Sequence, residues 1–156
     1  MTELLINPNK TACFTGHRIL SSSFNKDKLT KKVLELIKED YDTFLVGMAI
    51  GFDTEAFKVL LEIKKNIPLK IIACIPCLNQ QERFNKKQKE EYEFLLSCAD
   101  DKIVLSKEYT PTCMNKRNKF MVDYSSAVIA HLTRENGGTA NTVAYAIKNQ
   151  KLVIYV

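Results

Sequence analysis

The sequence predicts a single α/β domain, a Rossmann-like three-layer fold with a mostly parallel sheet and helices on both faces. Short apolar runs of strand length alternate along the chain with longer segments of helical periodicity. Most of the short runs are apolar without alternation, as in strands that are buried on both faces of a parallel sheet. The length of 156 residues suits one domain over residues 1–156 with a sizeable core.

The first half of the chain supplies three expected strands, at residues 11–15, 43–46 and 69–75. A helix is expected between the first two, with an apolar stripe of Leu29, Val33, Leu36 and Ile37. A second helix is expected before the third strand, where Asp53 or Thr54 is a capping residue type. Its expected buried residues are Ala56, Phe57, Leu60 and Leu61.

The second half supplies three further expected strands, at residues 101–105, 126–132 and 152–156, the first of them near a sheet edge. The helical segments expected around them are residues 80–97, 113–123 and 140–147. The first of these should bury Phe84, Tyr92, Leu95 and Leu96. The last should bury a face formed by Val143, Ala144 and Ile147, which recur at helical spacing.

A glycine turn separates the strand at 126–132 from the last helix. Gly137 and Gly138 permit a sharp turn and a close approach, and Thr139 and Asn141 are capping types at the expected helix start. The first amides of a helix lack internal partners, and the helix dipole makes this end positive. The turn is a candidate phosphate cradle, although a plain strand-to-helix connection would have the same sequence.

Four expected strands end in glycine, proline or polar residues. Gly16, His17 and Arg18 follow the first strand, residues 47–53 follow the second, and Pro76 follows the third, in addition to the glycine turn described above. In a parallel sheet these ends lie along one edge, and ligands bind there where the strand order reverses. This edge is therefore the candidate site.

The charged and polar residues near this edge each have two interpretations. Arg18 and Arg117 could hold phosphate with paired donors or form surface ion pairs. His17 could bind a ribose, act as an acid or base, or satisfy a nearby carbonyl. Asp53 could bind ribose hydroxyls or act as a base as well as capping its helix, and Asn118 could bind a base or phosphate, or cap a turn.

Composition narrows the classes of partner. The formal net charge of +5 suits an anionic ligand without requiring nucleic acid. Neither a signal peptide nor an apolar run of membrane-spanning length is present, so we expect a cytoplasmic protein without a membrane partner.

Cys74 and Cys77 have the spacing of a redox pair, but Cys74 falls inside an expected strand, which favours core packing. No second Cys or His pair completes a zinc site, and we expect no metal.

Several motifs together resemble a known family. They are Phe14 to Arg18, Gly47 to Asp53, Ile75-Pro76, Tyr109 to Asn118, Met121 to Asp123 and Gly137 to Thr142. In order and spacing they resemble the SLOG superfamily, which groups DprA/Smf with the LOG-type phosphoribohydrolases, and within it the YpsA-like branch of bacterial and phage proteins. The resemblance covers nearly the whole chain and is more specific for family than for activity.

The resemblance implies a pocket for a nucleotide-derived ligand such as ADP-ribose, an NAD-related molecule or a nucleoside monophosphate, with no cofactor required. It implies a sensor or regulatory module. In LOG-type enzymes a glutamate three residues after the threonine of the last glycine turn serves in N-glycosidic cleavage, and Thr142 occupies that position here. Arg117 matches their helix arginine. N-glycosidase activity is the alternative, with Asp53, Glu135 or His17 as catalytic candidates.

Single-stranded DNA binding of the DprA type is the third hypothesis, and a homo-oligomer is compatible with the resemblance.

The expected ligand-binding residues gather at the strand ends. They are Thr15, Gly16, His17, Arg18, Gly47, Gly51, Asp53, Pro76, Arg117, Asn118, Gly137, Gly138, Thr139, Asn141 and Thr142. His131, within its expected strand, is interpreted as a neighbour of the pocket or a core residue.

Overall fold

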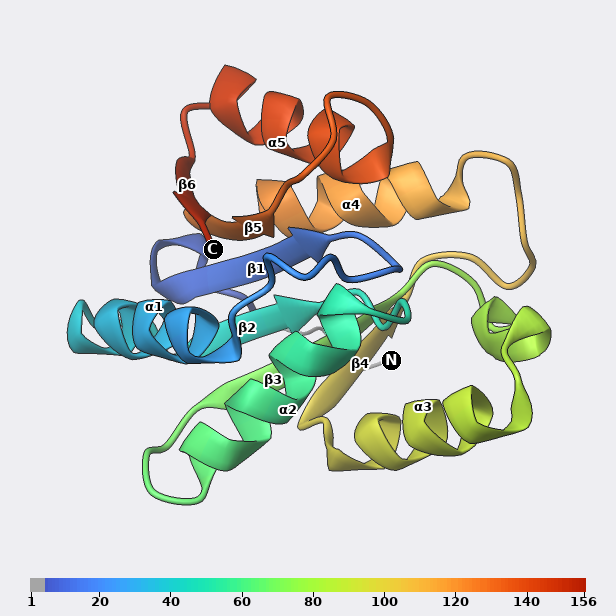
Figure 1. The fold of residues 1–156 in the computed structure, drawn as a ribbon, viewed down its shortest axis with the longest axis horizontal. Helices are drawn as coiled ribbons and strands as arrows, with labels where there is room; N and C mark the ends of the chain where they lie inside the picture. Colours follow the sequence, from blue (N-terminus) through green and yellow to red (C-terminus); the bar gives the residue numbers. More distant parts are fainter. Residues whose placement is uncertain (1–4) are drawn as a thin grey trace.

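The structure, a computed structural model, describes residues 5–156 as a six-stranded sheet between two layers of helices (Figure 1). All paired strands are parallel, and their order is β4-β3-β2-β1-β5-β6. The strands are β1 (Thr11–Gly16), β2 (Thr43–Val46), β3 (Lys70–Ile75), β4 (Asp101–Val104), β5 (Ala127–His131) and β6 (Leu152–Tyr155). The predicted fold class is confirmed, and β4 lies at an edge as expected. The order reverses between β1 and β5, which makes their carboxyl ends the switch point.

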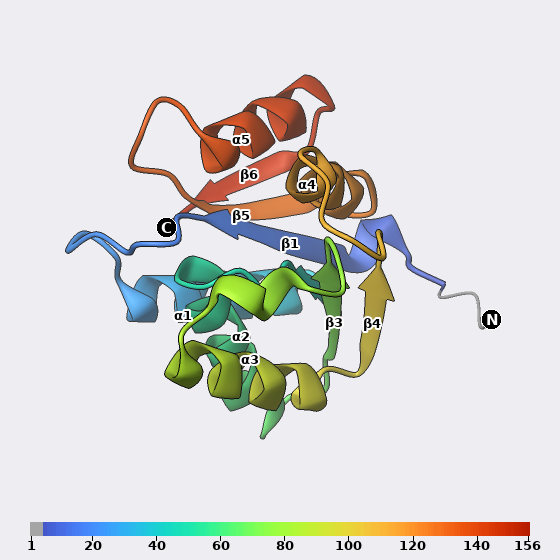
Figure 2. The same cartoon turned by 90° about the vertical axis from the view of Figure 1, so that its right-hand side faces the viewer.

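The helices divide between the two faces of the sheet (Figures 1 and 2). On one face lie α1 (Lys26–Lys38), α2 (Phe52–Lys64) and α3 (Lys86–Cys98). On the other lie α4 (Cys113–Asp123) and α5 (Gly138–Lys148). Two 3₁₀ turns, η1 (Pro8–Lys10) and η2 (Gln80–Arg83), complete the regular structure.

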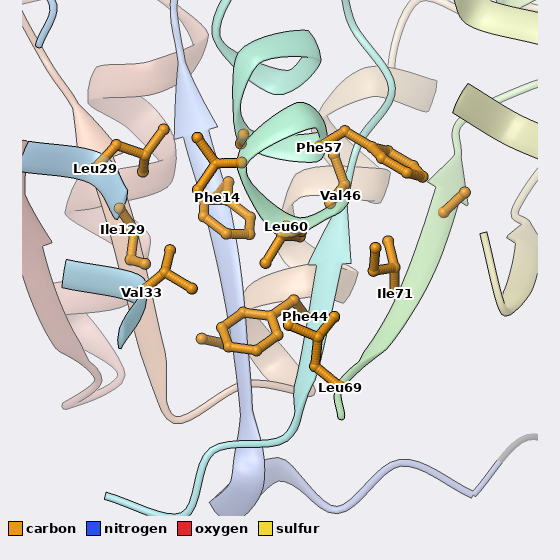
Figure 3. Packing of buried hydrophobic residues seen from close by; sticks show 14 of the residues in the cluster. Phe14, Leu29, Val33, Phe44, Val46, Phe57, Leu60, Leu69, Ile71 and Ile129 are labelled. Atoms are coloured by element: carbon orange, nitrogen blue, oxygen red, sulfur yellow. The ribbon is translucent and has the colours of Figure 1, made fainter. Parts of the chain in front are cut away.

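Alternate residues of each central strand bury against opposite helical layers. Phe14 and Phe44 face α1 and α2, where they pack in one cluster with Leu60 (Figure 3). Cys13 and Cys74 face α4 and α5 in a second cluster. Each fully buried large apolar side chain stabilises the fold by about 1.5–3 kcal/mol, so strands that are apolar on both faces bind the three layers together.

The prediction of one continuous helix over residues 80–97 is wrong, because this segment forms two separate elements, η2 and α3. Asn85 interrupts the segment and caps α3: its side-chain oxygen accepts from the amide of Gln88 at 2.8 Å. The amide of Asn85 in turn donates to the side-chain oxygen of Gln88 at 2.9 Å. This capping box satisfies two amides at the start of a helix and sets the helix boundary there.

The predicted caps of α2 and α5 are also wrong. Glycines precede both helices, with φ of 85° at Gly51 and 102° at Gly137, and neither helix has a side-chain cap. Asp53 instead lies in the first turn of α2, and Thr139 and Asn141 lie inside α5. The glycine starts leave first-turn amides without side-chain partners, as a phosphate site requires.

The buried face of α5 differs from the prediction. Ile147 is 58% exposed and Ala144 is also exposed. The buried residues are Thr139, Thr142, Val143 and Ala146. Thr142 is compatible with burial because its hydroxyl donates to the carbonyl of Gly138 at 2.8 Å. The prediction counted apolar residues alone and so missed the two threonines of this stripe.

Candidate functional site

A cavity of about 700 Å³ opens at the carboxyl ends of β1 and β5, at the switch point of the sheet. This main cavity is bounded by the β1–α1 segment, the start of α2, one side of α4 and the β5–α5 loop. Nine expected ligand-binding residues line it: Thr15, Gly16, His17, Arg18, Asp53, Arg117, Asn118, Gly138 and Thr139. Four further lining residues with polar or sulfur-containing side chains were not predicted: Ser21, Met114, Thr133 and Arg134.

The other predicted site residues do not line the main cavity. Gly47 lies behind it, where an added Cβ would stand 2.8 Å from Cζ of Arg117 and 3.0 Å from Oδ2 of Asp53. Thr142 lines a separate hollow between α4 and α5, and its hydroxyl is already bonded within the helix. The remaining predicted residues outside the lining are Gly51, Pro76, Gly137, Asn141 and Glu135.

Arg117 and Asp53 lie buried near each other at the base of the cavity, both beside Gly47, without a direct ion pair. Arg117 is 5% exposed; its Nη1 donates to the carbonyl of Gly47, and its Nε donates to Oδ1 of Asn118 at 2.8 Å. Oδ2 of Asp53 accepts from the amide of Ala49 at 3.1 Å. Burial raises the pKa of Asp53 to about 6, although Arg117 and the Ala49 amide act in the opposite direction. Asp53 therefore exchanges its proton near neutral pH, as an acid or base must.

His17 is buried between two donors. Its Nε2 accepts from the amide of Thr133 at 3.0 Å, and its Nδ1 lies 3.0 Å from Nη2 of Arg134. Burial, followed by the charge of Arg134, lowers the pKa of His17, so the ring is neutral at neutral pH. A neutral imidazole has one acceptor nitrogen. With Nε2 accepting from Thr133, Nδ1 carries the hydrogen and offers no acceptor to Arg134, whose guanidinium can turn to a ligand.

His131 serves the core beside the cavity and does not line it. Its ring stacks on Phe52 with centroids 6.0 Å apart and planes at 17°. Its Nδ1 lies 2.7 Å from the carbonyl of Val156, so this nitrogen donates and carries the hydrogen. The sequence left open whether His131 is a core residue or a neighbour of the pocket. It is both: its ring is buried, and it lies beside His17, which lines the cavity.

The arginines are concentrated at this edge of the sheet. The sequence has four, and three of them, Arg18, Arg117 and Arg134, line the main cavity. Within residues 5–156 no arginine has a carboxylate within 4.0 Å, and every such ion pair is made by a lysine. Arg18 is close enough to Arg117 to contribute to lowering its pKa, after burial as the main cause. Guanidinium groups without carboxylate partners are suited to bind an oxyanion.

Cys74 and Cys77 are not arranged as an exposed redox pair. Cys74 packs in the core, and burial raises the pKa of its thiol to about 12. Cys77 is also buried, beside the thiol of Cys113, and burial raises its pKa. Across residues 5–156 no group of three His, Cys, Asp or Glu side chains could hold a metal ion. The same residues include no helix long and apolar enough to cross a membrane.

A model of the YpsA family, the YspA SLOG family, matches residues 17–153, from the first strand end to the last strand. The chain belongs to this family. Proteins similar to this chain include the uncharacterized SPbeta prophage-derived protein YoqJ of Bacillus subtilis, which is 34% identical over 137 residues, or 79% of this chain and 80% of YoqJ. A UPF0398 protein of Bacillus thuringiensis is 28% identical over 128 residues, which cover 80% of this chain and 70% of the UPF0398 protein.

Two solved structures share the fold of this YpsA-family chain. DNA processing protein A from Helicobacter pylori matches with a TM-score of 0.68 and 20% identity, and that from Streptococcus pneumoniae with 0.67 and 20%. Each match covers 96% of this chain, which spans 65% and 50% of those two proteins. At this identity the likeness establishes the Rossmann-like fold, and the SLOG resemblance is confirmed by the family match.

The pKa of Asp53 predicts a specific pH dependence of stability. Raising a carboxyl pKa from 3.8 to about 6 corresponds to about 3 kcal/mol. Since the folded protein binds this proton more tightly than the unfolded chain, the stability that it contributes is complete below pH 4 and is lost as the pH rises through 6. We expect the wild-type free energy of unfolding, relative to that of Asp53→Asn, to fall by about 3 kcal/mol between pH 4 and 7. Urea unfolding at several pH values measures it, and a flat difference would contradict the burial of this carboxyl.

Proposed function

We propose that the chain binds a phosphate-bearing nucleotide or nucleotide derivative in the main cavity and acts as a sensor or regulatory module. The observation that carries the proposal is the set of three arginines without carboxylate partners around one cavity of about 700 Å³. The cavity volume is typical of small-molecule sites. Arg18 and Arg117 repel each other there, and an anion between them relieves that repulsion.

The start of α5 supplies the second part of the argument. Gly138 and Thr139 line the cavity, and the helix has no side-chain cap. Phosphate oxygens would accept from these first-turn amides and from Arg134, which has no acceptor in His17. Ribose hydroxyls would donate to Asp53 on the opposite wall. The ligand would then span the switch point, with its charge against α5 and its sugar against α2.

Asp53 also supports the alternative of N-glycosidic cleavage. Its carboxyl lines the cavity and has a pKa of about 6, as a group that protonates a leaving base or activates water would need. Glu135 does not line the cavity, and position 142, where LOG-type enzymes have glutamate, is a threonine bonded within α5. Asp53 is therefore the carboxylate that this alternative would use, and release of free base distinguishes it from binding alone.

Single-stranded DNA is the third candidate, supported by the structure of Helicobacter pylori DprA, which was studied for its single-stranded DNA binding mode. This reading predicts an affinity for oligothymidylate that falls steeply with salt, because phosphate contacts release counterions. The net charge of +5 is modest for such binding. A nucleotide held in an enclosed site would show a weaker salt dependence.

Calorimetric titration with ADP-ribose, NAD, AMP and cyclic ADP-ribose tests the proposal. Gly138→Glu places a carboxylate at the cavity edge, where an added side chain has open space, so the fold should be retained. We expect its affinity for the ligand to fall at least about tenfold through charge repulsion. The matched control is Ala144→Glu, an exposed position on the same helix outside the main cavity, which should leave affinity unchanged.

Three results would decide against the proposal in this form. Binding of none of the four ligands excludes the assignment of the cavity. Equal losses in Gly138→Glu and Ala144→Glu assign the effect to overall charge rather than to this site. Release of base from a bound nucleotide, lost in Asp53→Asn, replaces the sensor by the glycosidase.

A further inference from the structure

A second hollow of about 420 Å³ adjoins the main cavity. The two share three lining residues, Arg18, Ala49 and Met114, which therefore form the boundary between them. The second hollow extends from this boundary over the segment that follows β3 and under the loop between β4 and α4. None of its remaining lining residues belongs to the ligand-binding set that the sequence predicted.

The walls of the second hollow combine aromatic rings with two arginines and one carboxylate, Glu82, whose oxygen accepts from Asn79 at 3.1 Å. Phe84 and Tyr109 line it, and Tyr109 is 61% exposed although it is a large aromatic residue. Arg83 lines the hollow together with Arg18, and neither is among the residues that form ion pairs within 4.0 Å in the described chain. All four arginines of the sequence thus line one or both of the hollows. Exposed aromatic and guanidinium planes are the surfaces on which nucleobases stack.

The floor of the second hollow is fixed to the main cavity. Gln80 is buried; its Nε2 donates to the carbonyl of Gly47 at 3.1 Å, and its Oε1 accepts from the hydroxyl of Tyr92 at 3.3 Å. The same Gly47 carbonyl accepts from Arg117 of the main cavity. One backbone oxygen therefore joins both floors, so the two hollows have a fixed relative position and can recognise the two ends of one ligand.

We propose that the second hollow binds the second nucleoside of a ligand in which two nucleosides are joined through a pyrophosphate. This inference rests on the proposed function, which places the first nucleotide in the main cavity. The first phosphate lies at the start of α5, as in the proposed function, and the second phosphate lies at Arg18, the charged residue that the two hollows share. The second base stacks on Tyr109 with Arg83 nearby. A mononucleotide fills the main cavity alone and leaves the second hollow unused.

The experiment compares AMP, which has one nucleoside, with NAD, which has two joined by a pyrophosphate. Both are titrated into wild-type protein, Tyr109→Ala and Arg83→Ala. We expect wild type to bind NAD more tightly than AMP, and Tyr109→Ala to weaken NAD binding about tenfold while AMP binding is unchanged. Arg83→Ala should act in the same direction. Tyr155→Ala is the matched control, since Tyr155 is a half-exposed tyrosine on β6 that lines neither hollow.

The outcomes separate this inference from the function on which it rests. AMP and NAD binding with equal affinity, with Tyr109→Ala affecting neither, overturns the second subsite and leaves the main-cavity proposal intact. Binding of neither overturns both. Binding of oligothymidylate more tightly than NAD, and weakened by Tyr109→Ala, assigns the second hollow to nucleic acid and overturns the dinucleotide inference.

Discussion

Gly51→Ala should lower the free energy of unfolding by about 4 kcal/mol, the sum of two effects. Gly51 has φ of 85°, a conformation that strains any residue with a Cβ. An added Cβ would also overlap the backbone carbonyls of Arg18 and His17. Both carbonyls belong to the main chain and cannot turn away as a flexible side chain would. The carbonyl of His17 also accepts from the amide of Phe52 at 3.1 Å.

Gly137→Ala is the matched control for this prediction. Gly137 has φ of 102° and also precedes a helix, but nothing lies within 4 Å of an added Cβ. It should lose only the strain energy, about 1–2 kcal/mol. Urea unfolding of both variants separates strain from collision. Equal losses would mean that the close approach of the β1–α1 segment to the start of α2 contributes nothing to stability.

The sequence predicted the sheet well because its physical cause is local. The strand predicted at 43–46 coincides with β2, and the other strands differ from their predicted bounds by one or two residues. The helix predicted at 113–123 coincides with α4. A strand buried on both faces must be apolar throughout, and this requirement is visible without any tertiary knowledge. Helix starts were predicted less well, because Asp53 has a capping residue type and its actual role depends on burial.

The location of the candidate site was predicted, but not all of the residues that line it. Strand ends identified Gly16 to Arg18, since parallel topology alone brings them to one edge. Arg134 was missed, although a basic residue three positions after the end of β5 is a signal that could have been used. The second hollow could not be predicted, because Arg18, Arg83 and Tyr109 meet only through tertiary packing of segments far apart in the sequence.

Arg117→Met should destabilise the protein by about 3–5 kcal/mol at pH 8, because it removes two hydrogen bonds of a buried charged group, each worth about 1.5–3 kcal/mol. The variant loses the bonds from Arg117 to Gly47 and Asn118. It also leaves the ionised carboxylate of Asp53 buried without its nearby cation, which raises the pKa of that group further above 6.

The pH dependence distinguishes this mechanism from a general packing defect. At pH 5 Asp53 is mostly protonated in both proteins, so the loss in Arg117→Met should be smaller than at pH 8 by at least about 1 kcal/mol. Asp53→Asn in the same background should abolish this difference. Arg134→Met is the control, because Arg134 is exposed and its removal should change stability by less than about 0.5 kcal/mol while still weakening ligand binding. If Arg117→Met loses the same stability at both pH values, Arg117 stabilises the fold through its hydrogen bonds alone. Its charge would then contribute to ligand binding and not to the ionisation of Asp53.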